Sequence, residues 1–341
     1  MSGVRALGEL GLIQRIRAAP GVSCAAGVAV GIGDDTAVLE VTPSAVLLAT
    51  TDLLVEDVHF RRATATAREI GWKALAVNMS DIAAMGGTPR WALVALALPA
   101  SAEVEEVDEF YAGLREAAAP HGVIVVGGDT SASTAGWVVN VTLLGEHRGT
   151  PRLRSMGRSG DAVAVTGTLG GAAAGLAALE AGGAEALSRM TTEALEEITR
   201  AHRRPNARVA EGRFLADVGA VHALMDCSDG LSTDLGHICR ESGLAARIEV
   251  DRLPVSPAVH EAARALGRDP VAWATGGGED YELLLTCDPA AAADLAAGLA
   301  AATGTRLTVI GELASGAPGI AWVGARGEPI AVVAGYEHFR G

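Results

Sequence analysis

Apolar residues recur at helical spacing in three stretches of the first half of the chain, 6–18, 66–84 and 103–118. Apolar positions three and four residues apart share one face of a helix, so each stretch is predicted to be helical. The second helix should end at Gly86-Gly87, a typical stop signal. Shorter apolar runs between the helices predict strands at 46–49, 91–98, 123–126 and 137–144.

A polar stretch rich in Arg, Gly and Pro, 147–160, separates the two halves and predicts a domain boundary. We therefore expect one domain over 1–150 and a second over 151–341. The second should begin with a strand at 161–165. Further helices are expected at 206–216, 229–241, 257–266 and 289–302, and further strands near 246–250 and 282–286. Because both halves mix helix and strand, the sequence predicts two domains of the α/β (α+β) class.

Composition excludes several classes of protein. The chain has 341 residues, enough for two domains, and its net charge of −14 at pH 7 opposes binding to nucleic acid or an anionic membrane. The apolar run 91–100 is too short to span a bilayer, and residues 1–20 lack the pattern of a secretory signal. Four scattered cysteines form no C-x-x-C pair, so neither a zinc site nor a disulfide framework is expected. These features predict a cytoplasmic protein.

Acidic residues recur in short motifs where Gly, Ser or Thr adjoins Asp, at predicted strand or helix ends. Each motif alone has a structural explanation, because such residues form turns and helix caps. Six such motifs in one chain indicate a cation-binding site, because carboxylates gathered in one place repel one another unless a cation lies between them. Oxygen ligands without His or Cys favour Mg²⁺, with Mn²⁺ or Ca²⁺ as alternatives. The motifs are Gly31-Ile-Gly-Asp-Asp35, Thr50-Thr-Asp52, Asn78-Met-Ser-Asp81, Gly127-Gly-Asp-Thr130, Asp226-Cys-Ser-Asp229-Gly230 and Gly276-Gly-Gly-Glu-Asp280.

Familiar nucleotide-binding motifs are missing from the sequence. It contains no G-x-x-x-x-G-K-[ST] loop, and its single lysine, Lys73, falls inside a predicted helix. The protein-kinase motifs are also absent. In the turn 167–171, Leu169 stands where a G-x-G-x-x-G fingerprint needs its second glycine, which excludes a Rossmann site there.

Nine collinear motifs resemble the thiamine-monophosphate kinase family, of the aminoimidazole ribonucleotide synthetase superfamily, and they extend over nearly the whole chain. They are GELGLI (8–13), GIGDDTAVL (31–39), TTDLLVEDVHF (50–60), WKALAVNMSDIAAMG (72–86), GGDT (127–130), VTGT (165–168), DCSDGLSTDLGHI (226–238), GGGEDYEL (276–283) and GYEHF (335–339).

The resemblance implies the two-domain aminoimidazole ribonucleotide synthetase-like fold and a homodimer joined through the N-terminal domains. The N-terminal domain would bind ATP and metal, and the C-terminal domain would complete the nucleotide and substrate cleft. The implied metal ligands are Asp35, Thr50, Thr51, Asp52, Asp81, Asp129, Asp226 and Asp229, with Asp34 supporting its loop. The implied ATP contacts are Gly128, Asp129, Arg154 and Ser228, and the implied thiamine phosphate contacts are His59, Glu279 and Tyr336.

The implied reaction is the last step of thiamine diphosphate biosynthesis, in which ATP phosphorylates thiamine monophosphate by direct in-line transfer assisted by several Mg²⁺ ions. Because a phosphomonoester has a second pKa of about 6, the acceptor oxygen is already anionic and no general base is expected. Aminoimidazole ribonucleotide synthetase activity is the nearest enzymatic alternative. A non-catalytic acidic protein that binds divalent metal is the alternative from another class.

Some of these residues also have structural interpretations. His59 could be a half-buried histidine at a strand end, Tyr336 a C-terminal anchor, and Arg154 a solvated arginine of the linker. His202-Arg-Arg204 lies before a proline at a helix start and is interpreted as surface charge.

The sequence departs from the family pattern at three places. Asp57 replaces a usual glycine and adds an acid beside the substrate loop. Cys227 replaces a common aliphatic residue, a change expected to be buried and harmless. The loop 154–161 keeps Arg154 but lacks the family's lysine and proline.

Overall fold

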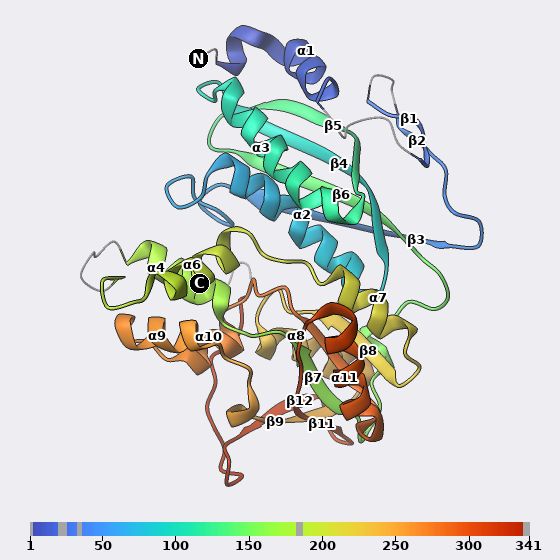
Figure 1. The fold of residues 1–341 in the computed structure, drawn as a ribbon, viewed down its shortest axis with the longest axis vertical. Helices are drawn as coiled ribbons and strands as arrows, with labels where there is room; N and C mark the ends of the chain where they lie inside the picture. Colours follow the sequence, from blue (N-terminus) through green and yellow to red (C-terminus); the bar gives the residue numbers. More distant parts are fainter. Residues whose placement is uncertain (1–2, 20–25, 33–35, 182–186, 337–341) are drawn as a thin grey trace. The chain divides into compact units, whose positions relative to one another are not determined.

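The protein is seen in a computed structural model that describes residues 3–19, 26–32, 36–181 and 187–336. The chain forms two compact units, whose helices and strands are labelled in Figure 1. The N-terminal unit comprises Met1–Ile82 and Gly87–Thr150, and the C-terminal unit comprises Ala83–Gly86 and Pro151–Gly341. Helix α2 (Ala67–Ala84) therefore begins in the first unit and ends in the second.

A four-stranded sheet of order β3-β6-β4-β5 forms the centre of the N-terminal unit. The pairs β3–β6 and β6–β4 are antiparallel, and β4–β5 is parallel. Its strands are β3 (Val46–Val55), β4 (Thr88–Pro99), β5 (Ile124–Ser133) and β6 (Val138–His147). The other elements are α1 (Val4–Arg17), α3 (Val104–Ala118), the 3₁₀ helix η1 (Ala119–His121) and the short pair β1 (Val28–Val30) and β2 (Val38–Leu39).

The central sheet has one covered face and one open face. Every second residue of β6 from Val139 to Leu143 is buried, and the residues between them are half-buried. Helix α3 covers the buried face, where Phe110 packs edge-on against Trp137 with ring centroids 6.2 Å apart. Helix α2 lies against α3, because a Cβ at Gly71 would be only 1.9 Å from the carbonyl oxygen of Phe110.

The C-terminal unit contains a six-stranded sheet of order β12-β9-β11-β7-β10-β8, antiparallel except for the β12–β9 pair. Its strands are β7 (Ala162–Thr166), β8 (Val221–Asp226), β9 (Ala245–Glu249), β10 (Leu283–Cys287), β11 (Leu307–Ala314) and β12 (Gly319–Val323). Its helices are α4 (Gly171–Glu180), α6 (Thr192–Arg203), α7 (Val209–Asp217), α8 (Leu231–Ser242), α9 (Pro257–Leu266), α10 (Pro270–Gly276) and α11 (Ala292–Thr303), with the 3₁₀ turns η2 (Arg154–Met156), η3 (Val250–Arg252) and η4 (Pro289–Ala291).

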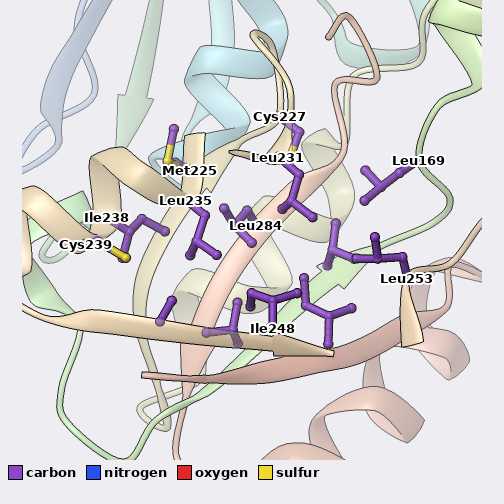
Figure 2. Packing of buried hydrophobic residues seen from close by; sticks show 14 of the residues in the cluster. Leu169, Met225, Cys227, Leu231, Leu235, Ile238, Cys239, Ile248, Leu253 and Leu284 are labelled. Atoms are coloured by element: carbon purple, nitrogen blue, oxygen red, sulfur yellow. The ribbon is translucent and has the colours of Figure 1, made fainter. Parts of the chain in front are cut away.

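The core of this unit lies between the sheet and α8. Strands β7, β8 and β10 are buried along their whole length, as expected for strands covered on both faces. Figure 2 shows Leu284 and Ile248 from the sheet close to Leu235 and Ile238 of α8. This packing fixes the C-terminal end of β8 and the start of α8, between which the Asp226–Gly230 motif lies.

The C-terminal unit also holds the end of α2. A Cβ at Gly212 of α7 would be 2.2 Å from the carbonyl oxygen of Ala83, so the two backbones touch. A Cβ at Gly86 would likewise be 2.2 Å from the Cβ of Ala216. Segment Ala83–Gly86 is therefore packed directly onto α7.

Most elements predicted from the sequence are present, and α9 spans the predicted residues 257–266. The placement of two acidic motifs at strand ends is wrong, because Thr50–Asp52 and Gly127–Thr130 lie inside β3 and β5. Pairing with β6 and β4 continues through both motifs and keeps these segments extended. The pattern also missed β8, β11, β12, α6 and α10. No helix among the described residues is long and apolar enough to cross a membrane.

Candidate active site

Two acidic motifs of the N-terminal unit meet through a threonine. The hydroxyl of Thr50 on β3 donates a hydrogen bond to the carboxylate of Asp81 on α2. Asp52 lies two residues beyond Thr50 on the same strand, and alternate residues of a strand share a face. Asp52 and Asp81 therefore belong to the same side of the sheet, one from the strand and one from the covering helix.

The side chain of Thr51 points to the opposite face of the sheet. Its Oγ1 lies 3.0 Å from Oγ1 of Thr142 and accepts a 3.0 Å hydrogen bond from Nδ2 of Asn140. Asn140 also donates to the backbone oxygen of Asp52 at 3.1 Å. Thr51 thus does not share a face with the Thr50, Asp52 and Asp81 group.

The Gly128-Asp129 motif lies on the edge strand β5. Gly128 pairs with Val94, and a Cβ at Gly128 would be 1.9 Å from the Val94 carbonyl oxygen. A glycine is therefore required by strand pairing whatever its role toward ATP. Asp129 is the next residue, paired with Ala95 and exposed.

His59 lies in a tight turn after β3. Its Nδ1 accepts a 3.0 Å hydrogen bond from the N–H of Val55, and this bond joins the two ends of the turn. Asp57 in the same turn has φ 66°, in the left-handed region that favours glycine. The family's glycine at this position is explained by that conformation. The predicted ligand Asp35 and its neighbour Asp34 lie outside the described residues.

Three acids of the C-terminal unit, Asp226, Asp229 and Asp234, lie around the start of α8 and influence one another electrostatically. Asp226 ends β8 and is 2% exposed, and Asp229 follows in the loop. Oδ2 of Asp234 on α8 accepts hydrogen bonds from the N–H groups of Asp229 at 3.2 Å and Gly230 at 3.1 Å. Burial, and then the charges of Asp226 and Asp229, raise the pKa of Asp234 to about 8. Asp234 is not among the residues predicted from the sequence, although its position four residues after the Asp229-Gly230 pair is a signal that could have identified it.

Backbone hydrogen bonds tie the 276–282 loop to the Asp226–Gly230 loop. The N–H of Glu279 donates to the carbonyl of Ser228 at 2.7 Å, and that of Tyr281 donates to Cys227 at 2.8 Å. Glu279 and Tyr281 have φ values of 59° and 50°, both left-handed. The structure therefore brings Ser228 and Glu279 together.

Tyr336 is part of the same cluster. Its N–H donates to the carbonyl of Asp229 at 2.8 Å, while its side chain is 50% exposed. Gly335 must be a glycine, because a Cβ there would be 2.4 Å from that same carbonyl oxygen. The backbone of Tyr336 thus anchors this segment, while the residue is half exposed.

The residue after Glu279 holds the loop to helix α4. Oδ2 of Asp280 accepts a 2.7 Å hydrogen bond from the N–H of Gly170, and Oδ1 lies 3.4 Å from the N–H of Ala172. Burial raises the pKa of Asp280 to about 7, although the positive end of α4 favours its charged form. This anchoring role could not be predicted from the sequence, in which Asp280 belongs to one of the six acidic motifs.

The far end of the loop is held by a buried ion pair. Nε and Nη2 of Arg208 donate to the two oxygens of Glu282 at 2.7 and 2.6 Å. Thr166 donates to the same carboxylate at 2.7 Å. Burial raises the pKa of Glu282 and Arg208 opposes that shift, so the paired carboxylate is stabilised in place.

Arg154 lies on η2 beside α8. Its carbonyl accepts a 2.8 Å hydrogen bond from Ser242, which also accepts one from Gly157 at 3.1 Å. Burial, and then the charges of Arg240 and Arg154, lower the pKa of His237 on α8. The loop is fixed by these bonds despite lacking the family's lysine and proline.

The interpretation of His202-Arg-Arg204 as surface charge is wrong for His202. This side chain is 7% exposed, and its Nδ1 lies 3.1 Å from Oε2 of Glu279. The interpretation followed the two arginines next to His202. It overlooked that His202 lies four residues after Ile198, on the buried face of α6. Cys227, which replaces a common aliphatic residue of the family, is buried, as expected.

The predicted site residues form two groups, one in each unit. The first contains Thr50, Asp52 and Asp81, and the second contains Asp226, Asp229 and the residues tied to them. Within the described parts of the chain, no three His, Cys, Asp or Glu side chains are close enough together to hold a metal ion.

Comparison with known proteins supports one family. Residues 33–147 match the AIR synthase related protein, N-terminal domain, and residues 158–323 match the AIR synthase related protein, C-terminal domain. The thiamine-monophosphate kinase of Rhodopirellula baltica is 38% identical over 273 residues, which cover 78% of each chain. That of Escherichia coli strain K12 is 35% identical over 347 residues, covering 98% of this chain and 99% of the other.

A solved structure agrees with these relatives. AaThiL complexed with AMPPCP and TMP superimposes with a TM-score of 0.76 at 34% identity, covering 99% of both chains. Since both AIR synthase related domains are present in order and the identity extends over most of the chain, this protein belongs to the thiamine-monophosphate kinase family.

Proposed function

We propose that this kinase transfers the γ-phosphoryl group of ATP to thiamine monophosphate, giving ADP and thiamine diphosphate. The observation that carries the proposal is its 34% identity, over 99% of the chain, to AaThiL complexed with AMPPCP and TMP. AMPPCP is an ATP analogue, so that relative binds a nucleotide and an acceptor together. The cluster of Ser228, Glu279 and Tyr336 in this chain supports the same arrangement.

In the proposed reaction an oxygen of the acceptor phosphate attacks the γ-phosphorus of ATP. A new P–O bond forms to thiamine monophosphate while the bond from the γ-phosphorus to the β–γ bridging oxygen breaks, and ADP leaves with that electron pair. The attacking oxygen is already anionic near neutral pH, so this chain need not supply a general base. Its own contribution is to position the two phosphates and to balance their charge.

The donor set of the chain fits Mg²⁺. Asp226 and Asp229 offer only oxygen atoms, and their charges help to raise the pKa of Asp234, a repulsion that a cation would relieve. We propose that four aspartates would hold Mg²⁺: Asp226, Asp229, Asp52 and Asp81. Further candidates are Asp35, Asp129, Thr50 and Thr51. When bound, Mg²⁺ would neutralise charge on the transferring phosphates.

Other residues would hold the two substrates. We propose that Arg154 and Ser228 contact ATP together with Gly128 and Asp129. Glu279 and Tyr336, with His59, would contact thiamine monophosphate, where the exposed ring of Tyr336 could stack on the cationic thiazolium. A cytoplasmic location stays a prediction.

The direct test is to incubate the purified protein with ATP and Mg²⁺ and vary the acceptor. We expect ADP and thiamine diphosphate to form in equal amounts, and only when thiamine monophosphate is the acceptor. ADP formation with aminoimidazole ribonucleotide precursors instead would support the synthetase alternative. Metal binding without any turnover would support the non-catalytic alternative.

We also propose a homodimer joined through the open face of the N-terminal sheet. Leu47 and Leu53 lie on that face of β3 and are 49% and 52% exposed. Large apolar side chains exposed together on one face are typical of an interaction surface. Light scattering should give twice the mass of the chain, and Leu53→Glu should give a monomer. Asp294→Glu on α11 is the control. A wild-type monomer at micromolar concentration would contradict the dimer.

A further inference from the structure

The 276–282 loop has a strained backbone. Gly278, Glu279 and Tyr281 have left-handed φ values of 67°, 59° and 50°. This region is open to glycine but unfavourable for Glu and Tyr, and such a conformation persists only where the surrounding structure enforces it. Strain of this kind is concentrated at functional sites, and the loop is bonded to Ser228 in the cluster described above. The groups that hold the loop therefore bear on function.

Glu282, the last residue of the loop, is fixed by its backbone and by its side chain. Its carbonyl oxygen accepts a 2.8 Å hydrogen bond from the N–H of Cys227. Its carboxylate accepts a 2.7 Å hydrogen bond from the hydroxyl of Thr166, and that hydroxyl accepts a 2.8 Å bond from the N–H of Leu283. A Cβ at Gly167 would be 2.0 Å from Oε1 of Glu282, so the carboxylate lies directly against the turn after β7.

Arg208 neutralises this buried carboxylate. Glu282 is 6% exposed, and Nε and Nη2 of Arg208 donate to its two oxygens at 2.7 and 2.6 Å. Nη1 of the same guanidinium donates to Oε1 of Glu211 at 3.4 Å, and Glu211 is also 6% exposed. One arginine therefore binds two buried carboxylates, one from the loop and one from α7. A buried carboxylate that loses its cationic partner takes up a proton or moves toward water, because burial disfavours an unpaired charge.

We propose that Arg208 is a positioning residue: through Glu282 it holds the 276–282 loop in its left-handed conformation and thereby sets the affinity for thiamine monophosphate. This inference rests on the proposed function, in which the loop contacts that substrate. A loop that is ordered before binding loses less conformational freedom when the substrate arrives. Loss of the ion pair should therefore raise the KM for thiamine monophosphate by about three- to tenfold and change kcat by less than about twofold.

The KM for ATP should respond less. The neighbouring Asp226–Gly230 loop has its own support, because Oδ2 of Asp234 accepts hydrogen bonds from the N–H groups of Asp229 and Gly230. These bonds do not involve Arg208. The KM for ATP should therefore change by less than about twofold when Arg208 is replaced.

The central comparison neutralises the two carboxylates in turn. Glu282→Gln and Glu211→Gln each keep the shape of a side chain that is 6% exposed and bound by Arg208. Glu282→Gln should raise the KM for thiamine monophosphate. Glu211→Gln is the matched control, which should lower the melting temperature and leave this KM unchanged. Arg208→Lys keeps the charge but not the planar pair of donors, so its KM should lie between those of the wild type and Arg208→Met.

A double-mutant cycle tests whether Arg208 acts through Glu282. In a Glu282→Ala background, Arg208→Met should have no further influence on the KM for thiamine monophosphate. An equal effect of Arg208→Met with and without Glu282 would refute this route.

Hydrogen exchange without substrate measures the order of the loop directly. The amides of Glu279 and Tyr281 are hydrogen-bonded in the folded protein. They should exchange faster in Arg208→Met than in the wild type, because the strained loop opens more often. In Glu211→Gln their exchange should be unchanged. Equal protection of these amides in Arg208→Met and the wild type would contradict the proposal.

The outcomes distinguish the two proposals. No thiamine monophosphate-dependent ADP from the wild type would refute the proposed function and the inference with it. An active wild type whose KM is unaltered by Glu282→Gln and Arg208→Lys would refute the inference alone, and these two variants carry the test if Arg208→Met does not fold. Equal rises of KM in Glu282→Gln and Glu211→Gln would also refute it, because they would reflect lost stability rather than a displaced loop.

Discussion

At the scale of single residues, local conformation explains one departure from the family pattern. Asp57 is exposed and has a left-handed backbone, a conformation in which glycine carries no penalty. Asp tolerates this region better than most residues, because it is among the non-glycine types enriched there. The substitution therefore keeps the turn but stores some strain in it.

We expect Asp57→Gly to leave the free energy of unfolding unchanged or raise it by up to about 1 kcal/mol. Asp57→Val should lower it by about 1–2 kcal/mol, because a β-branched residue suits this φ least. Urea denaturation of both variants measures the difference. Equal stability of Asp57→Val and the wild type would show that the turn is not held in this conformation.

Asp280 should make stability depend on pH. Its pKa is about 7 in the folded chain and 3.8 in the reference state, so the folded chain holds the proton more tightly between these values. Its contribution is therefore most favourable at low pH and is lost as pH rises from about 4 to 7, by at most about 1.4 kcal/mol per pH unit.

The comparison of wild type with Asp280→Asn isolates this dependence. We expect the free energy of unfolding of the wild type to fall relative to the variant as pH rises through that range. The measurement is denaturation at several pH values. A constant difference between the two proteins would show that Asp280 does not titrate there.

At the scale of elements, Gly128 fixes the approach of β5 to β4. A methyl group there would lie 1.9 Å from the Val94 carbonyl oxygen, so the strands would have to separate. Gly128→Ala should lower the free energy of unfolding by about 1–3 kcal/mol. Gly219→Ala is the control, because a Cβ at Gly219 would meet nothing within 4 Å. Similar melting temperatures of the two variants would contradict this account.

Elements with a clear apolar period could be predicted from the sequence, as the bounds of α9 illustrate. The limits of β3 and β5 could not, because they are set by pairing with strands distant in the sequence. The order of the motifs identified the candidate residues. The contacts between segments distant in the sequence could not be predicted, because a local sequence pattern does not specify them. The pairing of His202 with Glu279 and the anchoring of Asp280 on α4 are examples.

At the scale of the whole molecule, the residues proposed to hold Mg²⁺ include Asp226. Asp226→Asn keeps the shape of the side chain and removes its charge. It should lower kcat/KM by about 10²–10³-fold, the size of effect seen when one electrostatic contact to a transition state is lost. Removal of divalent metal with EDTA should abolish activity, and added Mg²⁺ should restore it. These effects are measured by ADP release.

The control for that substitution is Asp294→Asn, which removes an exposed charge on α11. It should leave kcat/KM unchanged. Full activity of Asp226→Asn, with normal Mg²⁺ dependence, would remove Asp226 from the proposed metal ligands.

The division of helix α2 bears on attempts to dissect the protein. A gene cut after codon 150 would leave Ala83–Gly86 on the first fragment and remove it from α7 on the second. The second fragment would then expose Gly212 and Ala216, which are shaped to receive that segment. We therefore expect the second fragment to be less stable alone than when it is co-expressed with the first, which carries the segment that packs on α7.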